Sequence, residues 1–345
     1  MANQEHSITR ADVARLAGVS TAVVSYVVND GPRGVSTTAR EKVLRAIRQL
    51  NYRPNPSARA LKTGSTGLIG VVVSDITNPH YGEFVEAIDA AAGAVGLSLM
   101  LGITHGDPEG EASLIGNLLS RGTDGLLLIN CRLTDDRLRT LGAADKPCVL
   151  MDRSLPGSML PTVNVDLQAG ARLALEHLAD HGHRRIAYVT GPLMENQIDH
   201  RRIAYDSVMR ERGLPRLEPL ITAWSRDGGY QSVEELLSWD EPPTAVFAAS
   251  DLIAIGVLNA AHDQGLAVPD DLAVVGLDGT MESAYVTPAL TTARQPLDLM
   301  AKEAIDVLTH PGSHAISPTF AVELIVRDSC GGHDSEMVSP QGATG

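Results

Sequence analysis

The feature that most constrains the fold is an alternation of short apolar runs with amphipathic stretches through residues 65–328 of this 345-residue chain. The apolar runs have the length and composition of buried strands and cover residues 68–73, 97–101, 125–129, 148–151, 186–189, 244–249 and 272–277. The stretches between them have helical spacing, as at residues 84–95, 167–180, 203–212 and 252–264. Strands that are apolar on both faces belong to parallel sheets covered by helices. The pattern therefore predicts an α/β body with parallel sheets.

The body repeats one of its own units. Residues 70–96 contain a strand, a polar loop, an amphipathic helix and then Gly-Leu, and residues 187–213 repeat this order. Two similar halves explain the repeat better than one very large sheet. We expect a first lobe over about residues 65–163 and 293–325 and a second over about 164–292. Residues 331–345 are rich in Gly, Ser and Pro and are expected to form a disordered tail.

Charge divides the chain near Gly64. The net charge of the whole chain is −14, but residues 1–64 carry +6 and the remainder carries −20. A basic segment attached to an acidic body suggests a small module for a polyanion, held by a body that repels polyanions. Because a basic face is often only a solvated face, charge alone leaves this interpretation weak.

Residues 1–54 have the pattern of three short helices. Thr9 and Asp12 form a capping pattern, Gly18 can end the first helix, Ser20 can cap the second and Ser36 the third. The apolar stripes expected to be buried comprise Val13, Leu16, Ala17, Val23, Val24, Val27, Val28, Val43, Leu44, Ile47 and Leu50. Two short helices joined by a three-residue turn, with a third behind them, make a helix-turn-helix unit. A plain three-helix bundle is the alternative.

The outer face of the second helix favours DNA binding. Thr21, Ala22, Ser25 and Tyr26 are small or hydroxyl-bearing and carry no charge. A face that is only solvated more often shows Lys and Glu. A face that enters the major groove needs close approach, hydroxyls for base edges and methyl groups for thymine.

The segment after the third helix can form about two helical turns over residues 56–62, with Asn55 as cap and Pro56 in the first turn. A helix this short is not stable alone in water. We expect it to fold only when it is docked to something.

The first 64 residues resemble the DNA-binding head of LacI/GalR-family transcription regulators. The matching motifs are Asp12-Val13-Ala14, Ala17-Gly18-Val19-Ser20, Val24-Ser25-Tyr26-Val27-Val28-Asn29, Thr38-Ala39-Arg40-Glu41-Lys42-Val43 and Leu50-Asn51-Tyr52-Arg53-Pro54-Asn55. The resemblance implies a head over residues 1–54 and a hinge helix and linker over 55–64 that folds on the operator, with a Leu in the minor groove.

The resemblance also implies which residues contact DNA: Thr21, Ala22, Ser25, Tyr26, Asn29, Ala58 and Leu61. Leu61 is at the position of the minor-groove wedge. Tyr26 departs from the family pattern, because the best-known members have Arg there. The operator sequence of those members therefore does not transfer to this chain.

The body, residues 65–330, resembles the effector domain of the same family, which is of the periplasmic-binding-protein type. The matching stretches include Ile76-Thr77-Asn78-Pro79 and Gly191-Pro192-Leu193, and the resemblance covers about residues 8–328. Ligands of open parallel sheets bind beyond the carboxyl ends of the strands, where this chain is rich in Asp, Arg, Asn and hydroxyls. The resemblance implies that the effector is bound by His80, Tyr81, Arg201, Trp224, Ser250 and Asp278. Asp152 joins these candidates because it follows an apolar run at the same sheet edge. These side chains suit a polar ligand.

Three of these residues have a clear physical fit. A carboxylate at Asp278 and a guanidinium at Arg201 offer paired hydrogen bonds, and the indole of Trp224 suits the C–H face of a sugar ring. The alternative for Trp224 is a surface or loop-packing side chain.

Several other classes of protein are disfavoured. No apolar run approaches the roughly 18–20 residues of a membrane span, and residues 1–10 do not resemble a signal peptide. Three irregularly spaced cysteines suit a reducing cytoplasm. His177, His181 and His183 have near-helical spacing, but no Glu or Cys completes a metal site, so we expect no metal. No dinucleotide loop, phosphate loop or nucleophile elbow follows a strand, so we expect no cofactor and no catalytic residues.

The sequence thus predicts a cytoplasmic, homodimeric transcription regulator, and in this family usually a repressor. It would bind near-palindromic double-stranded operator DNA under the control of a small polar effector such as a sugar, with no membrane partner. The alternative is a sugar-binding protein of transport type, which would need a signal peptide and would have no use for residues 1–64. An enzyme on an α/β scaffold ranks third.

Overall fold

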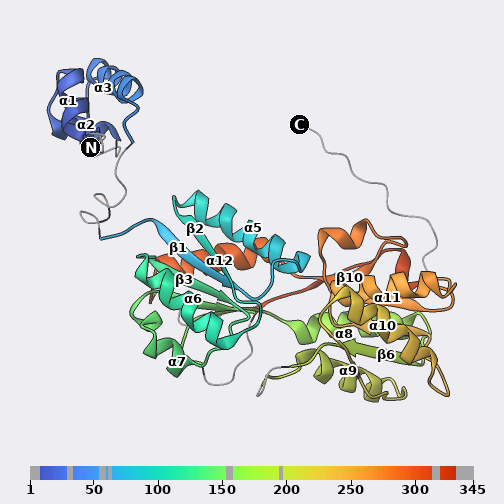
Figure 1. The fold of residues 1–345 in the computed structure, drawn as a ribbon. Helices are drawn as coiled ribbons and strands as arrows, with labels where there is room; N and C mark the ends of the chain where they lie inside the picture. Colours follow the sequence, from blue (N-terminus) through green and yellow to red (C-terminus); the bar gives the residue numbers. More distant parts are fainter. Residues whose placement is uncertain are drawn as a thin grey trace, which may run out of the picture. The chain divides into compact units, whose positions relative to one another are not determined.

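The computed structural model describes residues 8–28, 34–53, 60, 64–152, 158–193, 197–312 and 319–331. The chain divides into two compact units, Met1–Thr66 and Gly67–Gly345 (Figure 1). The expected disordered tail lies outside the described residues, except for Gly331. We describe each unit by itself.

The first unit contains the predicted helices: α1 (Arg10–Ala17), α2 (Thr21–Val28) and α3 (Thr37–Leu50). Each begins at a predicted cap. Thr9 and Asp12 form a reciprocal capping box, Ser20 Oγ accepts from the Val23 amide at 3.3 Å, and Ser36 Oγ accepts from the Ala39 amide at 3.3 Å. Gly18 ends α1 with a left-handed φ of 64°, a conformation that costs glycine little.

The core of this unit differs in part from the predicted stripes. Val13, Val24 and Val43 are fully buried, as expected. Leu16 and Leu44, however, are 46% and 38% exposed, so their predicted burial is wrong. Small side chains take the core positions beside the buried valines, namely Ala14 and Ala17 on α1 and Ala46 on α3. The buried faces of α1 and α3 are therefore rotated away from Leu16 and Leu44.

The first lobe of the second unit is a six-stranded sheet with order β11-β5-β4-β3-β1-β2. All its neighbouring strands are parallel. The strands are β1 (Leu68–Val73), β2 (Ser98–Ile103), β3 (Gly125–Ile129), β4 (Cys148–Met151), β5 (Thr162–Val165) and β11 (Thr319–Phe320). The helices are α5 (Pro79–Ala94), α6 (Pro108–Ser120), α7 (Asp135–Thr140) and α12 (Leu297–Thr309), with a 3₁₀ turn η1 (Ala143–Asp145).

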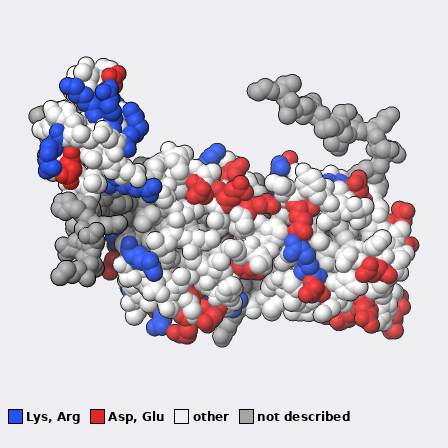
Figure 2. Space-filling model, turned by 45° about the horizontal axis from the view of Figure 1, so that its top comes forward, with Lys and Arg blue, Asp and Glu red and all other residues white. Residues whose placement is uncertain are grey.

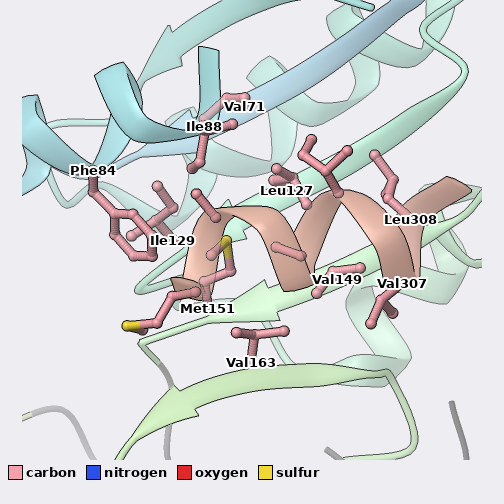
Figure 3. Packing of buried hydrophobic residues seen from close by; sticks show 14 of the residues in the cluster. Val71, Phe84, Ile88, Leu127, Ile129, Val149, Met151, Val163, Val307 and Leu308 are labelled. Carbon is pink, nitrogen blue, oxygen red and sulfur yellow. The ribbon is translucent and has the colours of Figure 1, made fainter. Parts of the chain in front are cut away.

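Helices cover both faces of this sheet, as expected for a parallel sheet. α5 and α12 supply Phe84, Ile88, Val307 and Leu308 to one core, where they meet strand residues such as Leu127 (Figure 3). On the opposite face, α6 and α7 pack in a second core.

The second lobe is a sheet with order β12-β10-β9-β8-β6-β7. Its strands are β6 (Ile186–Thr190), β7 (Leu220–Ile221), β8 (Ala245–Ala248), β9 (Ala273–Asp278), β10 (Thr291–Arg294) and β12 (Glu323–Ile325), of which β12 is antiparallel to β10. Its helices are α8 (Leu167–Asp180), α9 (His200–Glu211), α10 (Arg226–Leu237) and α11 (Asp251–Asp263), with 3₁₀ turns η2 (Met281–Ala284) and η3 (Asp328–Cys330). α8 and α9 cover one face, and α10 and α11 cover the other.

The predicted α/β class and two-lobed arrangement are confirmed, but the lobes meet at different residues than expected. β10 lies wholly in the second sheet, because it pairs with β9, and β12 pairs with β10. The expected boundaries at 292/293 and 325 are therefore displaced. The chain passes between the lobes at three places: after β5, after β10 and between β11 and β12.

Candidate functional sites

Two predicted site residues, Tyr81 and Asp152, meet the neighbouring Asn130 at the carboxyl edge of the first-lobe sheet. α5 begins after β1 with Asn78 as its cap, so His80 and Tyr81 lie in its first turn. Tyr81 Oη donates to Asp152 Oδ2 at 3.5 Å and accepts from Asn130 Nδ2 at 3.2 Å. Asn130 and Asp152 follow β3 and β4, and both have a left-handed φ of 51°. Such backbone strain in non-glycine residues concentrates at functional sites.

Asp278 approaches this cluster from the second lobe. It ends β9 and has an unusual φ of 138°. Its Oδ1 accepts from Gln295 Nε2 at 2.9 Å and lies 3.9 Å from His80 Nδ1. Both His80 and Asp278 are buried. The structure therefore brings together these two predicted residues from opposite lobes.

Arg201 and Trp224 form a second pair in the second lobe. The Arg201 Cζ lies 5.7 Å from the centroid of the Trp224 ring. The indole Nε1 donates to the Pro192 carbonyl at 3.0 Å, and a Cβ on Gly191 would meet the indole at 2.3 Å. Trp224 thus packs closely on the loop after β6, as its loop-packing interpretation predicts. Its contact with a ligand stays a prediction.

Ser250 and its neighbour Asp251 have structural partners. Ser250 Oγ accepts from the Ile253 amide at 3.3 Å and begins α11. The carboxylate of Asp251 is fully buried and accepts from Thr280 N and Oγ1 at 2.8 and 3.0 Å, and from Thr292 Oγ1. Asp251 therefore fixes the turn that follows Asp278. A direct contact of Ser250 with a ligand stays a prediction.

The predicted effector residues and their partners at the junction of the two lobes form the candidate effector cleft. Some buried polar atoms there have no hydrogen-bond partner among the described residues. These are both ring nitrogens of His80, Nε of Arg201 and Oε1 of Gln295. Buried polar groups are normally hydrogen-bonded, because leaving them unpaired is costly. A polar ligand between the lobes would supply partners to several of them at once.

Burial dominates the electrostatics of the cleft. It raises the pKa of Asp278 to about 7, against the opposing effect of Arg201, and it raises the pKa of Asp251 to about 7. Burial also lowers the pKa of His80 and raises that of Tyr81. The pKa shifts of these four groups all favour their uncharged forms, which suits a ligand bound through hydrogen bonds.

The candidate DNA surface lies on α2. Thr21 and Ala22 are exposed, and Ser25 and Tyr26 are half-buried on the same helix. Lys and Arg gather on this first unit, whereas Asp and Glu are prominent on the second (Figure 2). The predicted contacts Asn29, Ala58 and Leu61 lie outside the described residues.

Asn130, Asp251 and Gln295 are not among the predicted site residues. Asn130 carried a usable signal, because it directly follows the apolar run 125–129 at the same sheet edge as Asp152. Asp251 follows a strand in the same way. Gln295 gave no signal of this kind, since its importance comes from its contact with a residue 17 positions away.

The part of the chain that the structure describes contains no group of three or more His, Cys, Asp and Glu that can hold a metal ion. Within the same part, no single helix is long and apolar enough to cross a membrane; α1 and α2 pass on length and composition together, but they are bent by 105°.

The comparisons with known proteins agree with this architecture. Residues 9–55 match the family described as bacterial regulatory proteins, lacI family, and residues 175–330 match the periplasmic binding protein-like domain. The chain is 36% identical to catabolite control protein A of Priestia megaterium over 307 residues, 88% of this chain and 92% of that protein. It is 38% identical to the ribose operon repressor of Escherichia coli K12 over 306 residues, with the same shares.

Among solved structures, the lac repressor dimer bound to operator and the anti-inducer ONPF has a TM-score of 0.82 at 30% identity, covering 94% of this chain and 99% of that one. The class defined by fold and sequence is thus a DNA-binding transcriptional regulator with a helix-turn-helix head and a periplasmic-binding-protein-like body. The chain belongs to the lacI family of bacterial regulatory proteins.

Proposed function

We propose that this regulator is a repressor that binds near-palindromic operator DNA as a homodimer and responds to a small polar effector in the cleft. The observation that carries the proposal is a basic first unit whose second helix exposes small, uncharged groups. Such a surface suits base edges in the major groove. The similarity to an operator-bound lac repressor dimer over 94% of the chain supports this reading.

The effector that best fits the cleft is an uncharged, hydroxyl-rich molecule such as a monosaccharide. Asp152 and Asp278 supply acceptors, Arg201 supplies donors, and the Trp224 indole offers an apolar face. Two relatives support this class: the ribose operon repressor and a LacI-family regulator from Enterococcus faecium solved with bound ribose, which has 26% identity, covers 76% of this chain and 98% of that one, and has a TM-score of 0.68.

Homodimerisation is supported by an exposed apolar area on the second lobe. Met281 is 68% and Tyr285 is 81% exposed, and both lie at η2. Exposed apolar side chains that lie close together often mark protein interfaces. The lac repressor, which is similar over nearly the whole chain, is dimeric in its operator complex.

We further infer that the protein is not an enzyme and that it acts in the cytoplasm, where bacterial operator DNA is found. The relatives named above are regulators rather than enzymes. The alternative of a transport-type sugar-binding protein leaves the helix-turn-helix unit without a role.

The test is selection of duplexes from a random pool by the full-length protein, followed by affinity measurements at several salt concentrations. The recovered consensus should be near-palindromic, and the logarithm of the binding constant should fall linearly with the logarithm of salt. Thr21→Glu on the exposed face of α2 should abolish selection. Gln49→Glu, which adds the same charge at an exposed position of α3, should lose much less. Recovery of no consensus by the wild-type protein would rule out operator recognition.

A further inference from the structure

A hydrogen bond joins the two lobes outside the candidate effector contacts. Glu83, on the first-lobe helix α5, accepts through Oε1 from the backbone amide of Met281 at 2.8 Å. Met281 begins η2 in the second lobe, 198 positions later in the chain. The contact therefore joins two residues that are far apart in the chain and lie in different lobes.

The second-lobe partner is held rigidly. The turn before Met281 is fixed by Asp251, which accepts from both the amide and the hydroxyl of Thr280. The Gly279 amide donates to Thr292 Oγ1 at 3.2 Å, and a Cβ on Gly279 would overlap Arg294 at 2.3 Å. The same turn begins at Asp278, so a predicted effector residue lies three positions before the amide that Glu83 binds.

Glu83 lies beside a groove between the lobes. The groove has a volume of about 810 Å³ and is lined by residues of both lobes, including Glu86, Gly279 and Lys302. A charge-assisted hydrogen bond between the lobes beside this groove contributes directly to the preference for this arrangement of the lobes.

We propose that Glu83 is a positioning residue for effector binding: it holds the lobes together through the Met281 amide and does so without touching the effector. The link to the effector rests on the proposed function of the cleft. A molecule that binds between the lobes has an apparent affinity that depends on the population of the closed arrangement. Loss of one partly exposed charge-assisted contact should reduce that population about two- to fivefold.

The test measures lobe separation in the full-length protein with no ligand added. Spin labels are placed at Ser113→Cys on α6 and Gln231→Cys on α10, which are exposed positions on opposite lobes. The native cysteines, Cys131, Cys148 and Cys330, are buried. Labelled chains are mixed with excess unlabelled protein, and the distance distribution is recorded by pulsed electron resonance.

Three variants then separate the possible causes. Glu83→Ala removes the acceptor and should shift the distribution to longer, broader distances. Glu83→Gln keeps an acceptor oxygen and should restore a distribution close to that of the wild type. Glu86→Ala removes a neighbouring carboxylate from the same groove and should change nothing.

A wild-type distribution in Glu83→Ala, or an equal broadening in Glu86→Ala, would overturn the proposal. Failure of Glu83→Gln to restore the distribution would also overturn it, because the acceptor would then not be the operative feature. Neither DNA nor effector takes part in this measurement. A failure of the proposed regulator function, which appears as loss of operator selection by the wild type, is therefore distinguishable.

Discussion

The carboxyl groups of Asp251 and Asp278 are buried side by side in the second lobe, and this has consequences for stability. Burial raises the pKa of each to about 7, from an ordinary value of 3.8. Between these pH values the folded chain holds protons that the unfolded chain has released. The free energy of unfolding therefore falls, through these two groups, as the pH rises from about 4 to about 7. His80 acts in the opposite direction, because its lowered pKa adds stability as the pH rises towards 6.5.

We predict that Asp278→Asn removes much of this pH-dependent loss. Asn keeps an acceptor for Gln295 Nε2 but has no proton to release, and His80 remains in both proteins. Between pH 5 and pH 8, the variant should lose about 2 kcal/mol less unfolding free energy than the wild type. Urea unfolding followed by the fluorescence of Trp224 and Trp239 measures this. Parallel pH curves for the two proteins would show that Asp278 ionises normally in the folded state.

A second prediction at the residue scale concerns Tyr26, which is half-buried on α2. Replacing it with Arg introduces a bidentate donor that prefers guanine in the major groove. The preferred half-site should change, with about 1–3 kcal/mol of discrimination at each altered base pair. Duplex selection with both proteins checks this, and Gln49→Arg on α3 controls for the added charge. The same consensus from wild type and Tyr26→Arg would mean that residue 26 does not read bases.

At the scale of elements, α10 and α11 approach each other so closely that glycine is required on both helices. A Cβ on Gly229 would lie 2.0 Å from the Ile253 carbonyl oxygen, and one on Gly256 would lie 2.0 Å from the Arg226 carbonyl oxygen. These neighbours are backbone atoms, so a rotamer change cannot relieve the overlap. Only separation of the helices can do so, and this would open the core beneath them.

We therefore predict that Gly256→Ala destabilises the second lobe by about 1–3 kcal/mol. Gly116, in the middle of α6, has nothing within 4 Å of an added Cβ and is the matched control. Gly116→Ala should be neutral or stabilise by about 0.5–1 kcal/mol, because alanine favours helix. Thermal and urea unfolding of the two variants give the comparison. Equal stability of both would mean that the two helices separate at little cost.

The sequence predicted correctly those strands that can be recognised from their own residues alone. β1, β3 and β4 begin and end at the predicted residues, because each is a continuous apolar run between polar loops. β10 and β12 were not predicted, since they are short and polar in part and owe their place to pairing with distant strands. In the cleft, the pairs His80–Asp278 and Arg201–Trp224 could be listed as candidates, but their approach depends on the fold. Asn130 could have been found from its place directly after an apolar run, whereas Gln295 owes its place to a contact with Asp278 that no spacing rule encodes.

At the scale of the whole molecule, the point where the chain enters the second unit is firmly held. Gly67, with a left-handed φ of 71°, donates its amide to Asp124 Oδ2 at 2.7 Å. Its carbonyl accepts from the Ser98 amide at 2.9 Å, and the Asp124 amide donates to the Leu68 carbonyl at 2.7 Å. Asp124 precedes β3, so its carboxylate ties the start of the body to the centre of the first-lobe sheet.

This anchor leads to a prediction about coupling between effector and DNA. An effector changes operator affinity only through its differential affinity for two arrangements of the body, which typically amounts to 1–3 kcal/mol. We expect that preference to pass through the chain at Gly67, where the body begins. Asp124→Ala removes the acceptor that holds the Gly67 amide. The ratio of operator affinities with and without effector should therefore fall towards one. The effector affinity of the free protein should stay the same.

The measurement is a titration of operator with and without effector, using the monosaccharide that calorimetry identifies for the wild type, at constant salt. Asp124→Asn keeps an acceptor for the Gly67 amide and should retain most of the effect. Asp136→Ala removes an exposed first-lobe carboxylate that pairs only with Arg139 in its own helix among the contacts that the structure describes, and should retain all of it. Because binding coupling is reciprocal, operator must alter effector affinity by the same reduced factor in Asp124→Ala. An unreduced ratio in Asp124→Ala would show that coupling to the DNA-binding unit does not need the hydrogen bond between Gly67 and Asp124. A change in dimer geometry alone could then carry it.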